Sequence, residues 1–186
     1  MNIFLLDDAL GESARSMVDI HLAKQVLECM QLLGNCTELP KKDGTPYLAS
    51  HENHPLALWV KASLVNAAFC YKVAVACNNE HAHRKGKSLF DSYPFEEAYT
   101  YVATALYEQP TTFPLCVPEY IRQRLLPGYE LGSTPRVCES LTMAIKGYRA
   151  YYCMEKSRTL PSFEWTNRPM PYWWIEYCRK VGRVPF

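Results

Sequence analysis

Apolar residues recur along almost the whole chain at the spacing of α-helices, and stretches that alternate apolar and polar residues are nearly absent. In residues 55–77, for example, Trp59 and Val60 follow Leu56 by three and four positions. That spacing places side chains on one face of a helix, whereas a half-buried strand requires a period of two. The pattern predicts a mainly α fold: a single compact multi-helix domain over residues 1–186, with an extended N-terminal segment.

Local start and stop signals give the expected elements. Gly34 and Asn35 end the first helix, Asn53 caps the second, and Thr134 caps a later one whose first turn contains Pro135. The expected elements are an extended segment "NIFLL", helices near 12–33, 55–77, 94–108, 119–126 and 135–156, and a last short helix after an irregular aromatic segment.

The first predicted helix has an unusual polar stripe. On a helical wheel the stripe residues fall within an arc of about 120°; they are His21, Lys24, Gln25, Glu28 and Gln31. Such a stripe is typical of a solvated face, but it also places a histidine, an amine and a carboxylate side by side. Both interpretations stay open from periodicity alone.

Asp19 falls on the opposite, apolar side of the same wheel, among residues such as Leu22 and Val26. An unpaired carboxylate is costly in a protein core. We therefore expect Asp19 to meet a buried arginine, an aromatic donor or backbone N–H groups, in a structural tie. Three residues are candidates for this partner: Arg149, Trp165 and Arg168.

Composition is typical of a folded soluble protein, with 48% hydrophobic and 13% aromatic residues. The start "MNIFLLDD" lacks the basic flank and long apolar run of a signal peptide, and no run is long enough to cross a bilayer. The eight cysteines include no C-x-x-C pair, which favours reduced structural thiols. We expect a cytoplasmic protein without membrane association; the sequence does not determine its oligomeric state, for which a monomer is the default.

The formal net charge is only +1, but it is unevenly distributed. Residues 136–186 contain nine Lys/Arg and four Glu, a net charge of +5, whereas residues 1–135 contain 11 basic and 15 acidic residues, a net charge of −4. Such a basic third is either an ordinary solvated surface or an electrostatic footprint for nucleic acid or phosphate. The interleaved aromatic and basic residues of "KGYRAYYCMEKSR" and "EWTNRPMPYWW" suit base stacking, although most such rings serve as packing residues.

"MNIFLL", then "HLAKQVLE", then "NHPL" at the start of the next helix resembles the pyrimidine-dimer DNA glycosylase family, the phage endonuclease V type and its relatives. The resemblance covers about the first 80 residues and is patchy beyond them. It implies an all-α fold with the N-terminus threaded toward the middle. It also implies attack by a free α-amine on C1′ of a damaged nucleotide, an imine, and strand cleavage by β-elimination.

The resemblance assigns catalytic roles to Glu28 and Met1, with Lys24 as an alternative amine. The expected substrate-binding residues are His21, His54, Arg149, Trp165 and Arg168. An α-amine has an unperturbed pKa of about 7.7–8.0, so a useful fraction is neutral near pH 7. A carboxylate stabilises a developing sugar cation, as in glycoside hydrolysis. We expect Met1 and Glu28 within contact or one-water distance of each other, and no cofactor.

Two features differ from the family pattern. Asn2 is too large for efficient removal of the initiator methionine, so Met1 itself would be the nucleophile. A net charge of +1 is weak for an enzyme of duplex DNA, because phosphate neutralisation supplies much of the affinity. The low charge favours pre-extruded bases or free nucleotides as substrates.

Two other functions remain open from the sequence. The same polar residues would suit a non-catalytic phage protein that binds a nucleotide-like ligand or a host partner. Alternatively, Cys77, His81 and His83 have the spacing of metal ligands at a helix end, but no fourth ligand is evident. We therefore predict no metal site.

Overall fold

The computed structural model describes residues 1–46, 51–105, 110–125 and 140–183. Within these ranges the fold is helical and has no β-strand, apart from an isolated bridge between Pro40 and Pro46. This confirms the predicted mainly α fold. The helices are α1 (Leu10–Ser16), α2 (Asp19–Leu33), α3 (Pro55–Ala62), α4 (Leu64–Lys85), η1 (Phe90–Ser92), α5 (Phe95–Val102), α6 (Glu119–Leu125), α7 (Leu141–Tyr151), η2 (Tyr152–Lys156), α8 (Ser157–Thr159) and α9 (Tyr172–Val181).

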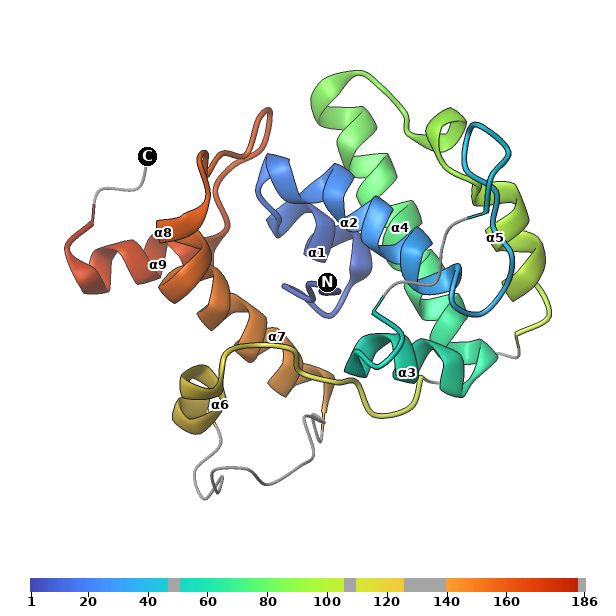
Figure 1. Ribbon diagram of the computed structural model, residues 1–186. Helices are drawn as coiled ribbons and strands as arrows, with labels where there is room; N and C mark the ends of the chain where they lie inside the picture. Colours follow the sequence, from blue (N-terminus) through green and yellow to red (C-terminus); the bar gives the residue numbers. More distant parts are fainter. Residues whose placement is uncertain (47–50, 106–109, 126–139, 184–186) are drawn as a thin grey trace.

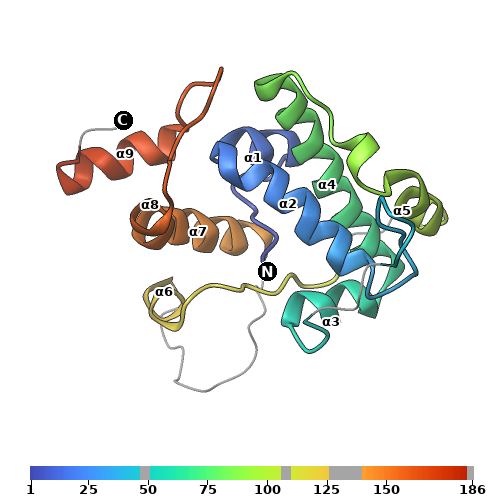
Figure 2. The same ribbon diagram turned by 45° about the horizontal axis from the view of Figure 1, so that its top comes forward.

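Helices α2 and α4 lie side by side at the centre of the molecule, with α1 against α4 (Figure 1). Helix α5 lies on one side of this pair, and α7, α8 and α9 lie on the other. The N-terminal segment runs between α2 and α7 in both views (Figure 2). Its residues Ile3, Phe4, Leu5 and Leu6 are all buried, because their side chains fill the space between the two helical groups.

The predicted helix over residues 12–33 is wrong as a single element, because the chain breaks between α1 and α2. Met17 and Val18 are extended, with ψ near 150°. The carbonyls freed by the break accept hydrogen bonds from side chains distant in sequence: Arg84 donates to Arg15 and Met17, and Trp165 donates to Ser16. These buried and partly buried bonds stabilise a break that local propensity does not predict.

The predicted helix over residues 55–77 is also divided. Helices α3 and α4 meet at an angle of 117° around Ser63. Ser63 is extended, and its hydroxyl accepts the N–H of Asn66, which makes it the N-cap of α4. Helix α4 then continues to Lys85, beyond the predicted end, and stops at Gly86 in the left-handed conformation.

The C-terminal elements follow the prediction more closely. Ser140 caps α7, whereas the predicted cap at Thr134 and Pro135 lies outside the described residues. Helix α7 continues through the π-helical turn η2 into α8, near the expected end at Lys156. Residues 113–117 cross α7 at Gly147, where a Cβ atom would lie 2.6 Å from Leu115 Cδ1. Glycine therefore permits this close approach.

The seven described cysteines all have free thiols: Cys29, Cys36, Cys70, Cys77, Cys116, Cys153 and Cys178. This agrees with the prediction of reduced structural thiols. Burial raises the pKa of Cys36 to about 11 and that of Cys153 to about 12, so both thiols are poor nucleophiles at neutral pH.

No single helix in the described ranges is long and apolar enough to cross a membrane. Helices α3 and α4 reach the necessary length and composition only when they are taken together across their bend.

Candidate functional site

The second residue of the chain is fixed against α2 by main-chain and side-chain contacts. The Asn2 N–H donates to Glu28 Oε2 at 2.7 Å, and the Asn2 carbonyl accepts from Gln25 Nε2 at 2.8 Å. When its amide is oriented to suit its neighbours, Asn2 Nδ2 also donates to the Cys116 carbonyl at 2.8 Å. The beginning of the chain is therefore held at a carboxylate.

Two further bonds continue this attachment along the N-terminal segment. The Phe4 N–H donates to Gln25 Oε1 at 3.0 Å, and the Leu6 N–H donates to the Ser13 hydroxyl at 2.8 Å. Gln25 thus satisfies both a donor and an acceptor of a buried extended segment, which would otherwise leave its backbone groups unpaired.

The polar stripe of α2 lies under this segment. His21 and Gln25 are 2% and 1% exposed, and the Glu28 side chain is 12% exposed. Lys24, in contrast, is 61% exposed. The solvated-face interpretation is therefore wrong for His21, Gln25 and Glu28, because the beginning of the chain covers them.

Met1 and Lys24 both bring an amine near Glu28. Lys24 Nζ lies 3.8 Å from Glu28 Oε1 in an i,i+4 ion pair. The Met1 nitrogen is three covalent bonds from the Asn2 nitrogen, so covalent geometry keeps it within about 6.5 Å of Glu28 Oε2. Met1 is half-buried and packs against the core. The site therefore combines one carboxylate with two candidate amines.

His21 lies in an aromatic cluster beneath the N-terminal segment. Its ring stacks on Phe4 at a centroid distance of 4.8 Å, and its Nδ1 is hydrogen-bonded to the Tyr152 hydroxyl. Burial, together with the nearby charges of Lys156 and Lys24, lowers the pKa of His21 to about 3. His21 is thus neutral near pH 7, and it orients Phe4 and Tyr152 rather than presenting a charge to solvent.

The buried neutral His21 predicts a pH-dependent stability. In the unfolded chain a histidine binds a proton below a pKa of about 6.5, whereas folded His21 stays neutral down to about pH 3. Because the unfolded state then binds more protons, stability falls as pH falls. We expect the free energy of unfolding to decrease by about 2 kcal/mol from this group between pH 7 and pH 5.

Urea unfolding at several pH values measures this slope. His21→Gln removes the titrating group and is expected to flatten the slope over that range, while the matched variant His83→Gln, at an exposed position of α4, is expected to retain it. Equal slopes in the two variants would show that His21 does not carry the effect.

Asp19 is tied structurally, as predicted, but the three named partners are wrong. Its carboxylate accepts from Arg84 at 2.8 Å, from Lys85 at 2.6 Å and from the Thr166 N–H at 3.0 Å. Burial acts to raise the pKa of Asp19, but the hydrogen bonds from Lys85, Thr166 and Arg84 outweigh it and lower the pKa to about 2. The arginine and backbone donors that we expected are present, on different residues.

The remaining predicted binding residues gather in other places. Arg149 donates from Nε to the Leu6 carbonyl at 2.7 Å and forms a 3.0 Å ion pair with Asp7, at the other end of the N-terminal segment. His54 caps α3 by accepting the Leu56 N–H at 3.2 Å.

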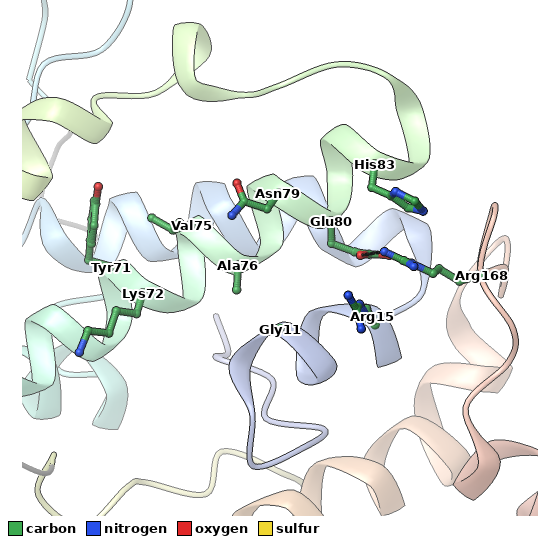
Figure 3. Close-up of a pocket in the computed structure, with 10 residues that line it drawn as sticks. All are labelled: Gly11, Arg15, Tyr71, Lys72, Val75, Ala76, Asn79, Glu80, His83 and Arg168. Carbon is green, nitrogen blue, oxygen red and sulfur yellow. Dashed lines mark hydrogen bonds and ion pairs between the residues drawn. The ribbon is translucent and has the colours of Figure 1, made fainter.

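Trp165 and Arg168 belong to the loop between α8 and α9, which reaches the break between α1 and α2. Trp165 is buried and donates to the Ser16 carbonyl, as described above. Arg168 forms two hydrogen bonds with Glu80, of 2.8 and 2.9 Å (Figure 3). The predicted binding residues therefore do not all converge on Glu28.

The metal-ligand alternative finds no support in the part of the chain that the structure describes. Cys77 is fully buried, with its thiol 3.8 Å from Met17 Sδ, and His81 Nδ1 contacts the Lys87 carbonyl at 2.8 Å. No group of three or more histidine, cysteine or acidic residues in the described ranges is arranged to hold a metal ion.

Sequence reasoning missed the roles of Gln25 and Asn2. The signal for Gln25 was present in its position between Lys24 and Glu28 on the stripe, but a pattern cannot tell which backbone such an amide will meet. Comparisons with protein-family models, with curated proteins and with solved structures gave no match for this chain.

Proposed function

We propose that this protein is a DNA base-excision enzyme, a glycosylase with an associated lyase activity, in which an amine near Glu28 attacks C1′ of the target nucleotide. The observation that supports this proposal most strongly is the 2.7 Å hydrogen bond from the Asn2 N–H to Glu28. It fixes the beginning of the chain beside a largely covered carboxylate, as the chemistry requires.

Each step assigns a role to these residues. The neutral amine forms a bond to C1′ while the glycosidic bond breaks and the base leaves with its bonding electrons. Glu28 stabilises the positive charge that develops on the sugar. Loss of a proton from the amine and opening of the ring give an imine. Removal of a C2′ proton then expels the 3′ phosphate and cleaves the strand.

Met1 is the preferred nucleophile over Lys24. α-Amines as a class have a lower ordinary pKa than lysine side chains and form imines more readily near pH 7. Lys24 is mostly exposed and forms a 3.8 Å ion pair with Glu28. Lys24 is then suited to contact a phosphate near the reacting sugar.

Borohydride trapping tests the proposal. The protein is incubated with duplexes that contain a pyrimidine dimer or an abasic site, in the presence of borohydride, which reduces an imine to a stable amine. We expect a covalent protein–DNA band with the abasic duplex, and also with the dimer duplex if dimers are excised. A matched undamaged duplex is the control.

The absence of a band on both damaged duplexes, with protein that retains its helical circular dichroism, would contradict the proposal. In that case tight binding of a nucleotide without turnover would support the alternative of a non-catalytic binding protein.

A further inference from the structure

A cavity of about 470 Å³ lies between α1 and α4, away from the residues of the proposed amine site (Figure 3). Its apolar part is formed by Gly11, Val75 and Ala76, and Tyr71 stands at one end. Its charged lining consists of three cationic side chains, Arg15, Lys72 and Arg168, and one carboxylate, Glu80; His83 also lines it.

Two cations of this cavity, Arg168 and Lys72, have hydrogen-bonding capacity left. Glu80 is held by both Arg84 and Arg168, so its negative charge is already balanced inside the protein. Arg168 uses Nε and Nη2 for Glu80, and its Nη1 has no acceptor within the described part of the chain. Lys72 is exposed and forms no ion pair with any described residue.

A second cavity, of about 540 Å³, adjoins the first and shares Arg15 and Arg168 with it. It adds Arg149 and the rings of Tyr172 and Trp173, and Tyr172 is 72% exposed. Its three carboxylates each already pair with a cation: Asp7 with Arg149, Glu12 with Arg15, and Glu176 with Lys180. The first two pairs also use part of Arg149 and Arg15, so an anion entering this cavity meets the remaining N–H groups of these arginines and no unpaired carboxylate of the lining.

Together the two cavities form what we call the Arg15–Arg168 groove, with guanidinium groups in the middle and aromatic rings on both sides. Lys72 and His83 lie eleven residues apart on one face of α4, which is about 16 Å along the helix. This length allows more than one phosphate of a strand to lie along the groove. Alternating cations and rings are the arrangement by which proteins bind single strands.

We propose that the Arg15–Arg168 groove binds single-stranded nucleic acid. Phosphates contact Lys72, Arg15 and Arg168, and bases stack on Tyr71 at one end and on Tyr172 at the other. A single strand fits better than a duplex, because its bases are free to stack and because the chain has a net charge of only +1. This proposal does not depend on amine chemistry at Glu28 and stands if imine trapping fails.

Fluorescence anisotropy with a labelled 15-nucleotide oligo(dT), measured at several salt concentrations, tests the groove. We expect Lys72→Glu and Arg15→Glu each to weaken binding by about tenfold and to reduce the salt slope by about one. Tyr172→Ala is expected to weaken binding by about tenfold with an unchanged salt slope, because stacking involves no counterion release. Lys61→Glu on α3 makes the same charge change at an exposed lysine outside both cavities and is expected to bind like the parent protein.

Three results would overturn the proposal. The first is equal affinity of Lys72→Glu and Lys61→Glu for oligo(dT), which would show that the position of the removed positive charge does not matter. The second is binding of a 15-base-pair duplex as tight as that of the single strand. The third is no measurable binding of oligo(dT) by the parent protein at low salt. Helical circular dichroism of every variant excludes loss of folding as the cause.

Discussion

Glu28→Gln is expected to lower the single-turnover rate of glycosidic-bond cleavage at a damaged nucleotide by about a hundredfold. The glutamine side chain keeps an oxygen that can accept the Asn2 N–H, so the beginning of the chain stays in place. What is lost is the negative charge beside the reacting sugar. The expected effect therefore separates the chemistry of Glu28 from its structural contact.

Glu38→Gln is the matched control, because it removes one carboxylate at an exposed position after α2. It is expected to cleave at the parent rate. A Glu28→Gln variant that keeps the parent rate would remove Glu28 from the mechanism, whereas equal losses in both variants would point to overall charge rather than to a site.

Arg84→Met is expected to lower the free energy of unfolding by about 3–5 kcal/mol, measured by urea unfolding. Arg84 has a fully buried side chain that donates to the carboxylates of Glu80 and Asp19 and to the carbonyls of Arg15 and Met17. Methionine leaves these acceptors in the interior without their main donor. The break between α1 and α2 would lose the group that satisfies it.

Lys85→Met provides the comparison, because Lys85 contacts the same Asp19 from a side chain that is 42% exposed. Partly exposed ion pairs contribute about 1 kcal/mol or less, so this variant is expected to unfold close to the parent. A loss for Arg84→Met no larger than that for Lys85→Met would contradict the role of Arg84 as the buried centre of this network.

The sequence was sufficient to predict the helices, because their apolar spacing reports which face is buried. It was not sufficient to predict the breaks. The break before Asp19 depends on Arg84 and Trp165, which reach it from distant parts of the chain. The bend at Ser63 has a local signal in the serine cap, but the apolar spacing continues through it and hides the cap.

For the candidate site, too, the sequence predicted the kinds of residue involved but not their tertiary partners. The periodicity of the polar stripe of α2 could not decide whether His21, Gln25 and Glu28 face solvent or lie beneath another segment. Whether a stripe faces solvent or a covering segment is a tertiary property, and the wheel cannot show it. Because burying a carboxylate is costly, the sequence correctly predicted that Asp19 pairs with an arginine and with backbone donors. It did not predict which residues supply them. Arg84 and Thr166 are 65 and 147 residues away.

Peptide mapping of the borohydride-trapped adduct tests the central claim most directly. The first tryptic peptide, residues 1–15, contains no lysine, so an adduct on it identifies the α-amine of Met1. An adduct on Lys24 would instead block cleavage there and give the peptide 16–41. We expect the adduct on residues 1–15, and an adduct on the Lys24 peptide or on any other lysine would contradict attack by the α-amine of Met1.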